Sequence, residues 1–284
     1  MKTIQYFKVS LIALAAVAIN GCQSEAIDNG LSNDNFSATF EVKPVAGSAN
    51  RFVLNATTPN LLGSKWNLGD GSGTYLGQMQ EPIFLPDAGT YVVEHTAIGK
   101  GGSQKTATQT INVATSDVNS GNLVQGGKFL NAADHAKWTV LNIAGNSTRW
   151  TFGAGFARIN GTSGGWDQQG IFQAVNVIGG KRYKIDMNVA GSAAVNTWFE
   201  VYIGTAVPVQ NTDYTSLGRR VGLSTWDGCA TSTYDGKLST LRCVGSGEIV
   251  TFPTSQTVYF LIKSGGNNLG ATGITIRNVE FRGI

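Results

Sequence analysis

Hydrophobic and polar residues alternate along much of the chain from residue 36 onward, which is the pattern of half-buried β-strands. No stretch shows a convincing helical period. Runs rich in Val, Thr and aromatic residues predict strands at 39–45, 51–56, 91–98, 106–113, 182–189, 197–203, 257–263 and 274–281. Turns rich in glycine, asparagine and aspartate separate these runs, so we predict an all-β protein built from sandwiches.

The length of 284 residues is sufficient for two domains. A run of Ser, Thr, Asn, Asp and Gly at 115–121 predicts a linker between a domain at 36–114 and a second at 122–284. The polar segment at 22–35 is expected to be a flexible tether before the first domain.

Two motifs lie in the first domain. Residues 66–72 read Trp-Asn-Leu-Gly-Asp-Gly-Ser, and residues 86–93 read Pro-Asp-Ala-Gly-Thr-Tyr-Val-Val. Together they resemble the PKD domain, an immunoglobulin-like module, with Leu68 in place of its usual Phe. The resemblance implies an immunoglobulin-like sandwich that acts as a spacer. Trp66 is expected in its core, and His95 at the strand surface.

Three motifs span the second domain, at 122–129 with Trp138, at 173–183 and at 274–281. They resemble the galactose-binding-like jelly rolls, a group that includes carbohydrate-binding modules, and imply a jelly-roll β-sandwich with Trp138 in the core. Trp150 is assigned to the core as well. Such modules often hold a structural calcium through the final strand. In these modules an Asp is common at the position of Arg277, and its absence here puts the calcium site in doubt. We expect no other metal or cofactor.

The N-terminus has the features of a signal peptide at 1–21, with Lys2 and Lys8 before an apolar run at 9–19 that is too short to span a bilayer. Residues 18–22 resemble the lipobox of bacterial lipoproteins, which implies lipidation of Cys22. The residue after Cys22 is Gln23, whereas a signal for retention in the inner membrane has an aspartate at this position. We expect a lipid-anchored outer-membrane protein that faces the cell exterior; the alternative is a plain secretory signal cut elsewhere.

Cys229 and Cys243 remain, fourteen positions apart around a turn-like stretch. In an oxidising compartment they are expected to form a disulfide, and the alternative is two buried thiols. A zinc site is not expected, because neither histidine has ligand spacing relative to these cysteines.

Composition excludes some functions. Without residues 1–21 the chain has 19 basic and 18 acidic residues, a balance that gives no indication of nucleic acid binding. The chain has two histidines, so few residues could supply the general base of a catalytic triad. No phosphate loop or nucleophile motif occurs.

Polar loops with a single tryptophan are the best candidate ligand sites, because a sugar presents an apolar C–H face and a rim of hydroxyls. One such loop holds Trp166, Asp167 and Gln168, and another holds Trp226 beside Cys229. The alternatives are Trp166 folded over the sheet edge and Trp226 packed on the disulfide. Tyr234 is a weaker candidate.

The run at 197–203 places Trp198, Glu200 and Tyr202 on one strand face. We expect this face to bind ligand together with Asp186 and Asn188 of a neighbouring strand. The alternative is a half-exposed face covered by loops.

A lipoprotein signal, an immunoglobulin-like spacer and a carbohydrate-binding-like sandwich together resemble the surface glycan-binding proteins of Sus-type uptake systems. The resemblance implies non-catalytic binding of a polysaccharide, with a β-glucan such as laminarin as the best guess, and a Sus-type transporter as a partner. One alternative is a sandwich glycoside hydrolase, for which Asp186 and Glu200 could be the carboxylate pair. The other is an adhesive lipoprotein that binds protein partners.

Overall fold

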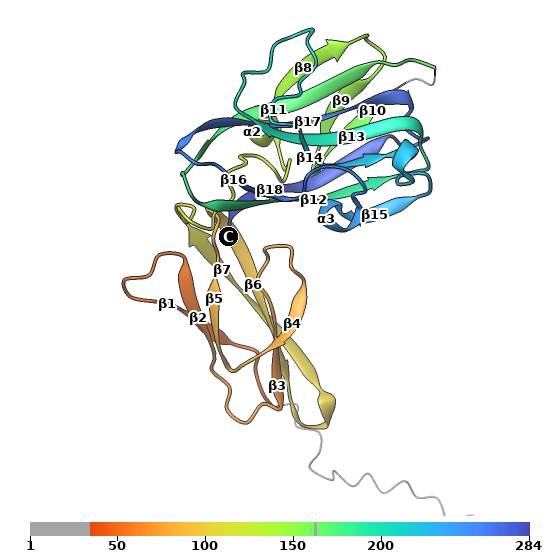
Figure 1. Ribbon diagram of the computed structural model, residues 1–284. Coiled ribbons are helices and arrows are strands. Elements are labelled where there is room, and N and C mark those ends of the chain that lie inside the picture. The colour runs from red at the N-terminus through yellow and green to blue at the C-terminus, as the bar shows by residue number, and fades with distance from the viewer. Residues whose placement is uncertain (1–34, 162–163) are drawn as a thin grey trace, which may run out of the picture. The chain divides into compact units, whose positions relative to one another are not determined.

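The computed structural model describes residues 35–161 and 164–284 (Figure 1), so the predicted signal peptide and Cys22 lie outside the described residues. The chain divides into two units. The first is Met1–Ile83 with Thr90–Ile111, and the second is Phe84–Gly89 with Asn112–Ile284. No helix of the described residues is long and apolar enough to cross a membrane.

The first unit contains two antiparallel sheets joined by a core of aromatic and aliphatic side chains. Their strands, in sheet order, are β1 (Phe40–Pro44), β2 (Arg51–Ala56) and β5 (Gln80–Phe84), then β4 (Thr74–Gly77), β3 (Gly63–Asn67), β6 (Gly89–Ile98) and β7 (Gln104–Val113). A 3-10 turn, η2 (Lys100–Gly102), precedes β7. Trp66 of β3 is fully buried and meets Phe40 of β1 edge to face at 5.2 Å.

His95 of β6 is buried, so the prediction that it lies at the surface is wrong. The alternation that turns Tyr91 and Val93 inward also turns His95 inward. Its ring stacks on Trp66 at 4.1 Å. Its Nδ1 donates to the Ala38 carbonyl at 2.8 Å, and its Nε2 lies 2.9 Å from the hydroxyl of Ser64. These two hydrogen bonds offset the cost of burying the imidazole.

The second unit is a sandwich of two antiparallel sheets with short helices at its margins. Sheet C has the order β15 (Tyr234–Lys237), β12 (Arg182–Gly191), β18 (Ile274–Gly283), β10 (Phe156–Asn160) and β9 (Arg149–Gly153), and β16 (Ile249–Thr251) also pairs with β12. Sheet D has the order β14 (Arg219–Ser224), β13 (Val195–Gly204), β17 (Gln256–Asn268), β11 (Gln168–Val177) and β8 (Thr139–Ala144). The helices are α2 (Ala132–His135), η3 (Thr225–Asp227) and α3 (Leu238–Leu241).

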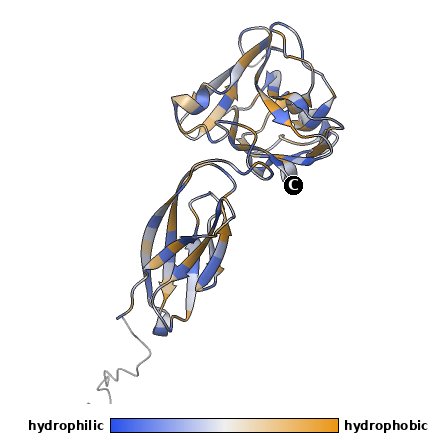
Figure 2. Ribbon diagram, turned by 90° about the vertical axis from the view of Figure 1, so that its left-hand side faces the viewer, coloured by the Kyte–Doolittle hydropathy of each residue, from blue (hydrophilic) through white to orange (hydrophobic). Residues whose placement is uncertain are grey.

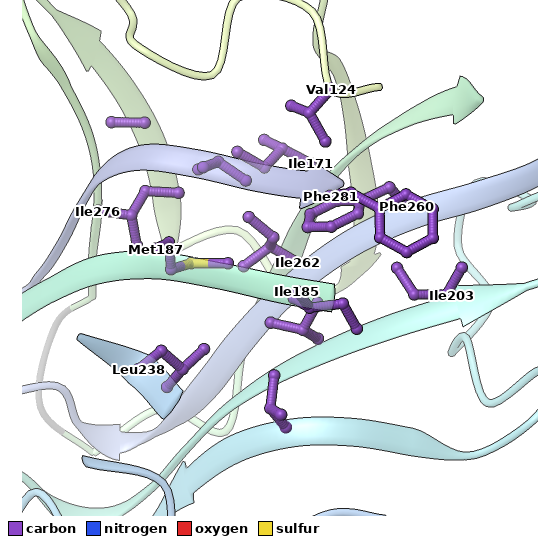
Figure 3. Close-up of a cluster of buried hydrophobic side chains, with 14 of the residues drawn as sticks. Val124, Ile171, Ile185, Met187, Ile203, Leu238, Phe260, Ile262, Ile276 and Phe281 are labelled. Atoms are coloured by element: carbon purple, nitrogen blue, oxygen red, sulfur yellow. The ribbon is translucent and has the colours of Figure 1, made fainter. Parts of the chain in front are cut away.

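Apolar side chains from the inner faces of sheets C and D form one core (Figure 3). Phe260 and Ile262 of β17 meet Phe281 and Ile276 of β18 there. Hydrophobic and hydrophilic positions alternate along many of the strands (Figure 2). Trp138 and Trp150 are each 6% exposed in this unit, as predicted. The all-β sandwich predicted from the sequence is therefore confirmed.

The predicted pairing of two strand faces is wrong. β13, which carries Trp198 and Glu200, belongs to sheet D, whereas β12, which carries Asp186 and Asn188, belongs to sheet C. These consecutive strands lie in opposite sheets because the chain crosses the sandwich between residues 191 and 195. Their outward faces consequently point away from each other.

Candidate functional site

Three tryptophans meet at one end of sheet D. Trp198 comes from β13, Trp226 from η3 and Trp166 from the loop before β11. The ring centroids of Trp166 and Trp226 lie 6.3 Å apart with 16° between their planes, and those of Trp198 and Trp226 lie 6.3 Å apart with 31° between planes. Trp166 is 54% exposed and Trp226 is 55% exposed. This tryptophan cluster unites three of the residues that the sequence singled out.

A glycine leaves room for the indole of Trp198 to lie across the sheet. Trp198 pairs with Gly265 of β17, and Gly265 pairs with Gln168 of β11. A Cβ on Gly265 would lie 2.9 Å from Cζ2 of Trp198, closer than such contacts normally come. Sequence reasoning missed Gly265, because one glycine among 37 carries no signal of its own.

The turn that carries Trp226 is fixed at several points. The Ser224 hydroxyl donates to the carboxylate of Asp227 at 2.6 Å. Gly228 closes the turn in the left-handed region at φ 85°, where a side chain would be strained. The next residue, Cys229, is bonded to Cys243. The predicted disulfide is therefore confirmed, and it anchors the exposed indole of Trp226.

Asp167 positions the loop of Trp166. Its carboxylate accepts the backbone N–H groups of Asn146 at 2.8 Å and Ser147 at 2.5 Å. Hydrogen bonds from Ser147 hold the pKa of Asp167 below its usual value. Gly164 donates to Asn267 of β17 from the other side of the loop. The carboxylate of Asp167 is thus engaged in holding this loop.

Gln168 is the polar side chain best placed beside the tryptophan cluster. It is half-buried and lies on the strand next to Gly265, over which the Trp198 indole extends. Its amide makes no hydrogen bond with another side chain of the described residues. An amide offers both a donor and an acceptor to sugar hydroxyls.

Glu200 lies two residues after Trp198 but its carboxylate is enclosed. It accepts from Arg219 at 2.8 Å and from the hydroxyl of Tyr202 at 2.9 Å, and it lies 3.5 Å from Lys263. Burial and the charge of Glu200 raise the pKa of Tyr202. Lys263 is 3% exposed and also pairs with Asp213 at 2.5 Å.

The loop at 205–218 covers this part of sheet D. Tyr214 from the loop packs edge to face on Tyr202 at 5.9 Å and is itself buried. Leu261 and Leu141 complete a small second core beneath it. This half of the face matches the alternative of a surface covered by a loop, while the half around Trp198 stays open.

Asn188 and Tyr234 lie in sheet C and are not brought to the tryptophan cluster. The Tyr234 side chain packs against the main core, and burial raises the pKa of its hydroxyl. Asp186 accepts the hydroxyl of Ser239 at 2.9 Å. The carboxylate pair Asp186 and Glu200, considered for a hydrolase, is split between the two sheets.

No group of three or more His, Cys, Asp or Glu side chains in residues 35–161 and 164–284 is arranged to hold a metal ion. Arg277, where an Asp is common in the jelly rolls that the sequence resembles, lies on β18, and its side chain supplies no oxygen ligand.

No protein-family model matches the chain, and no curated protein matches it. Among solved structures, one similar chain comes from a study of promiscuous carbohydrate-binding modules of the beta-sandwich superfamily. It is 14% identical with a TM-score of 0.31, and the match covers 88% of this chain and 99% of that chain. A CBM4 structure is 15% identical with a TM-score of 0.35, covering 57% of this chain and 99% of that chain.

The enzymatically active domain of the bacteriophage CBA120 tailspike protein 4 is also similar. It is 12% identical with a TM-score of 0.38, and the match covers 61% of this chain and 23% of that chain. At these scores the likenesses identify no ligand, so the function has to be inferred from the side chains of this chain.

Proposed function

We propose that the second unit binds a polysaccharide without cleaving it, through the tryptophan cluster. The observation that carries this proposal is the exposure of Trp166 and Trp226, each by more than half, on loops that are fixed by hydrogen bonds and a disulfide. Neighbouring apolar side chains that are exposed together on a protein surface often mark a binding site. A fixed ring also loses little conformational entropy when it binds.

The spacing of the rings indicates how a sugar docks. A sugar ring between two indoles needs about 7 Å, because each contact takes about 3.5–4.0 Å. The centroids of Trp166 and Trp226 are only 6.3 Å apart. The sugar therefore stacks on the outer faces and edges of the cluster, where Gln168 can bond its hydroxyls.

The carboxylates near the cluster support a non-catalytic role. Hydrolysis of a glycosidic bond requires two carboxyl groups that flank the bond. Asp167 is held by backbone N–H groups, Asp227 by Ser224, and Glu200 by Arg219 and Lys263. Each of these carboxylates already has a structural partner.

The wider role rests on the sequence. The lipobox at Cys22 and the PKD-like motif around Trp66 favour a lipid-anchored protein of the outer membrane whose first unit is a spacer. We propose a β-glucan such as laminarin as the ligand, delivered to a Sus-type transporter.

The first test is affinity electrophoresis of the lipid-free chain from Gln23 onward. The gels contain laminarin, mixed-linkage glucan, xylan, mannan or alginate. We expect one polysaccharide to slow the protein, with no reducing ends released on overnight incubation. If the folded protein is slowed by none of them, the glycan proposal fails and the adhesive alternative gains support.

The second test identifies the site. Trp166→Ala is expected to abolish retardation while Tm falls by less than about 2 °C, because a half-exposed indole contributes little to folding. Val209→Ala, at a 60% exposed position on the loop 205–218, is the matched control and should migrate like the wild type. A Trp166→Ala protein that is still retarded would place the site elsewhere.

A further inference from the structure

The outer face of sheet C carries a second group of ligand-type side chains, away from the core. Lys237 of β15 pairs with Asn188 of β12, and Asn188 pairs with Arg277 of β18. Ala157 of β10 pairs with Ile276, so the outward residues next to them, Phe156 and Arg277, are also neighbours. Arg158 lies one row further along β10, opposite Thr275. We name Phe156, Arg158, Asn188, Lys237 and Arg277 the basic band.

The ring of Phe156 forms part of this face. A Cβ on Gly153 would lie 2.4 Å from the Phe156 ring, so the glycine lets the ring lie across β9. The guanidinium of Arg158 lies 5.0 Å from the ring centroid. Its Nε donates to the hydroxyl of Thr275 at 2.9 Å, which fixes its orientation. An aromatic ring and an oriented guanidinium thus lie together on an open face.

The charge of the band is not neutralised within the protein. Arg158, Arg277 and Lys237 form no ion pair with a carboxylate of the described residues. Three acidic residues share this face. Asp235 neighbours Lys237, Asp186 accepts from Ser239, and Glu280 accepts from Arg282. The band itself thus carries three positive charges without an ion-pair partner, and Glu280 is the one carboxylate of these three that is paired, with Arg282.

Asn188 stands between the two neighbouring cations in the strand register, because it pairs with Lys237 on one side and with Arg277 on the other. Its Oδ1 is enclosed and accepts no hydrogen bond within the described residues. A ligand on this face therefore meets the side chains of Lys237 and Arg277 and not this oxygen.

We propose that the basic band is a second binding surface, for sugar units that carry a carboxylate or a sulfate. The planar guanidinium of Arg277 can bind such an anion through two parallel hydrogen bonds. The C–H face of the sugar ring covers Phe156, beside the guanidinium of Arg158. This surface is independent of the tryptophan cluster, which lies on sheet D.

The test uses the lipid-free chain in affinity gels with polygalacturonate, κ-carrageenan or neutral dextran. We expect at least one of the two acidic polymers to slow the protein at low salt. Dextran should slow it much less. Retention by polygalacturonate alone identifies a carboxylate, and retention by carrageenan alone a sulfate. About 0.5 M NaCl should weaken the interaction by screening the charges.

The double variant Arg158→Ala/Arg277→Ala is expected to bind at least tenfold more weakly. Lys128→Ala/Lys137→Ala removes the same charge from exposed positions of the same unit and should bind like the wild type. Thermal unfolding verifies that each variant is folded, and Arg277→Gln is the milder replacement if the double variant is not.

Two results would overturn the proposal. One is the absence of retardation in both acidic gels, and the other is an equal loss in the lysine control, which would indicate attraction by net charge alone. Trp166→Ala should leave acidic retention unchanged. The failure of this surface is therefore distinguishable from a failure of the tryptophan cluster.

Discussion

Two buried polar side chains are accommodated by opposite means. His95 stays neutral between a carbonyl and a hydroxyl, so no charge has to be desolvated. Lys263 forms ion pairs with Asp213 and Glu200. The first arrangement makes stability depend on pH, and the second makes it depend on the carboxylate partners.

Burial lowers the pKa of His95 below its usual value of 6.5, although the hydrogen bond to Ala38 opposes part of this shift. Below that pH the unfolded chain takes up a proton that the folded chain excludes. The stability of the first unit should therefore be complete above about pH 6.5 and decline as the pH falls towards the lowered pKa. Calorimetric unfolding between pH 7.5 and 5 measures this decline. His95→Gln should be less stable at pH 7.5 but show a shallower pH dependence, and an equal slope in both proteins would contradict the assignment.

Glu200→Gln tests whether this residue holds the fold or contacts the ligand. Removal of its charge leaves the buried Lys263 with only Asp213, and loss of one partner of a buried pair typically costs about 3–5 kcal/mol. We expect a clear drop in the midpoint of urea unfolding. Glu248→Gln, which breaks a more exposed pair with Arg242, should cost much less. Unchanged stability with lost glycan binding would instead make Glu200 a ligand residue.

At the scale of elements, the turn of η3 depends on the disulfide after it. Closing a loop between residues 229 and 243 stabilises by about 3 kcal/mol in the chain-entropy model. Without the bond, the Trp226 turn has to be ordered when the ligand binds. Reduction should therefore weaken polysaccharide affinity by about tenfold, measured by titration calorimetry. The chain from Gln23 onward contains no other cysteine, so an unchanged affinity would show that the turn is fixed without the bond.

The strands that could be predicted are those with clean alternation. The expected run 51–56 coincides with β2, and 182–189 lies within β12. β3, β4 and β5 gave no such signal, because their five or four residues include glycine, proline and polar side chains. Short strands of this kind form through pairing with distant partners, as β3 does with β6.

The same limit applies to the candidate site. Trp166, Trp198 and Trp226 were found because an aromatic residue in a polar context, or on an outward strand face, is visible locally. Asn188 and Asp186 were misplaced because alternation gives the face of a strand but not the sheet it joins. The enclosure of Glu200 could not be predicted, because the loop at 205–218 that covers this part of the sheet has no periodic pattern in the sequence.

At the scale of the whole molecule, the proposed export and lipid anchoring would link binding to a biological role. The sites proposed on sheets C and D act at a cell surface only if the chain is retained there. Cys229 and Cys243 form a bond that belongs to an oxidising compartment, which agrees with export. Export alone does not distinguish an anchored protein from a secreted one.

Cys22→Ser distinguishes these two outcomes. If Cys22 carries the lipid, each buried methylene contributes about 0.8 kcal/mol to membrane affinity, and several acyl chains together give stable anchoring. The wild type should then fractionate with outer membranes, take up a labelled fatty acid and be digested by protease added to intact cells. The Ser variant should lose the label and leave the membrane fraction, whereas Ser24→Ala should behave like the wild type. If Cys22→Ser leaves fractionation unchanged, the lipobox does not provide the anchor. Because the substitution changes no residue of the tryptophan cluster, glycan binding by the purified chain should be the same in either case.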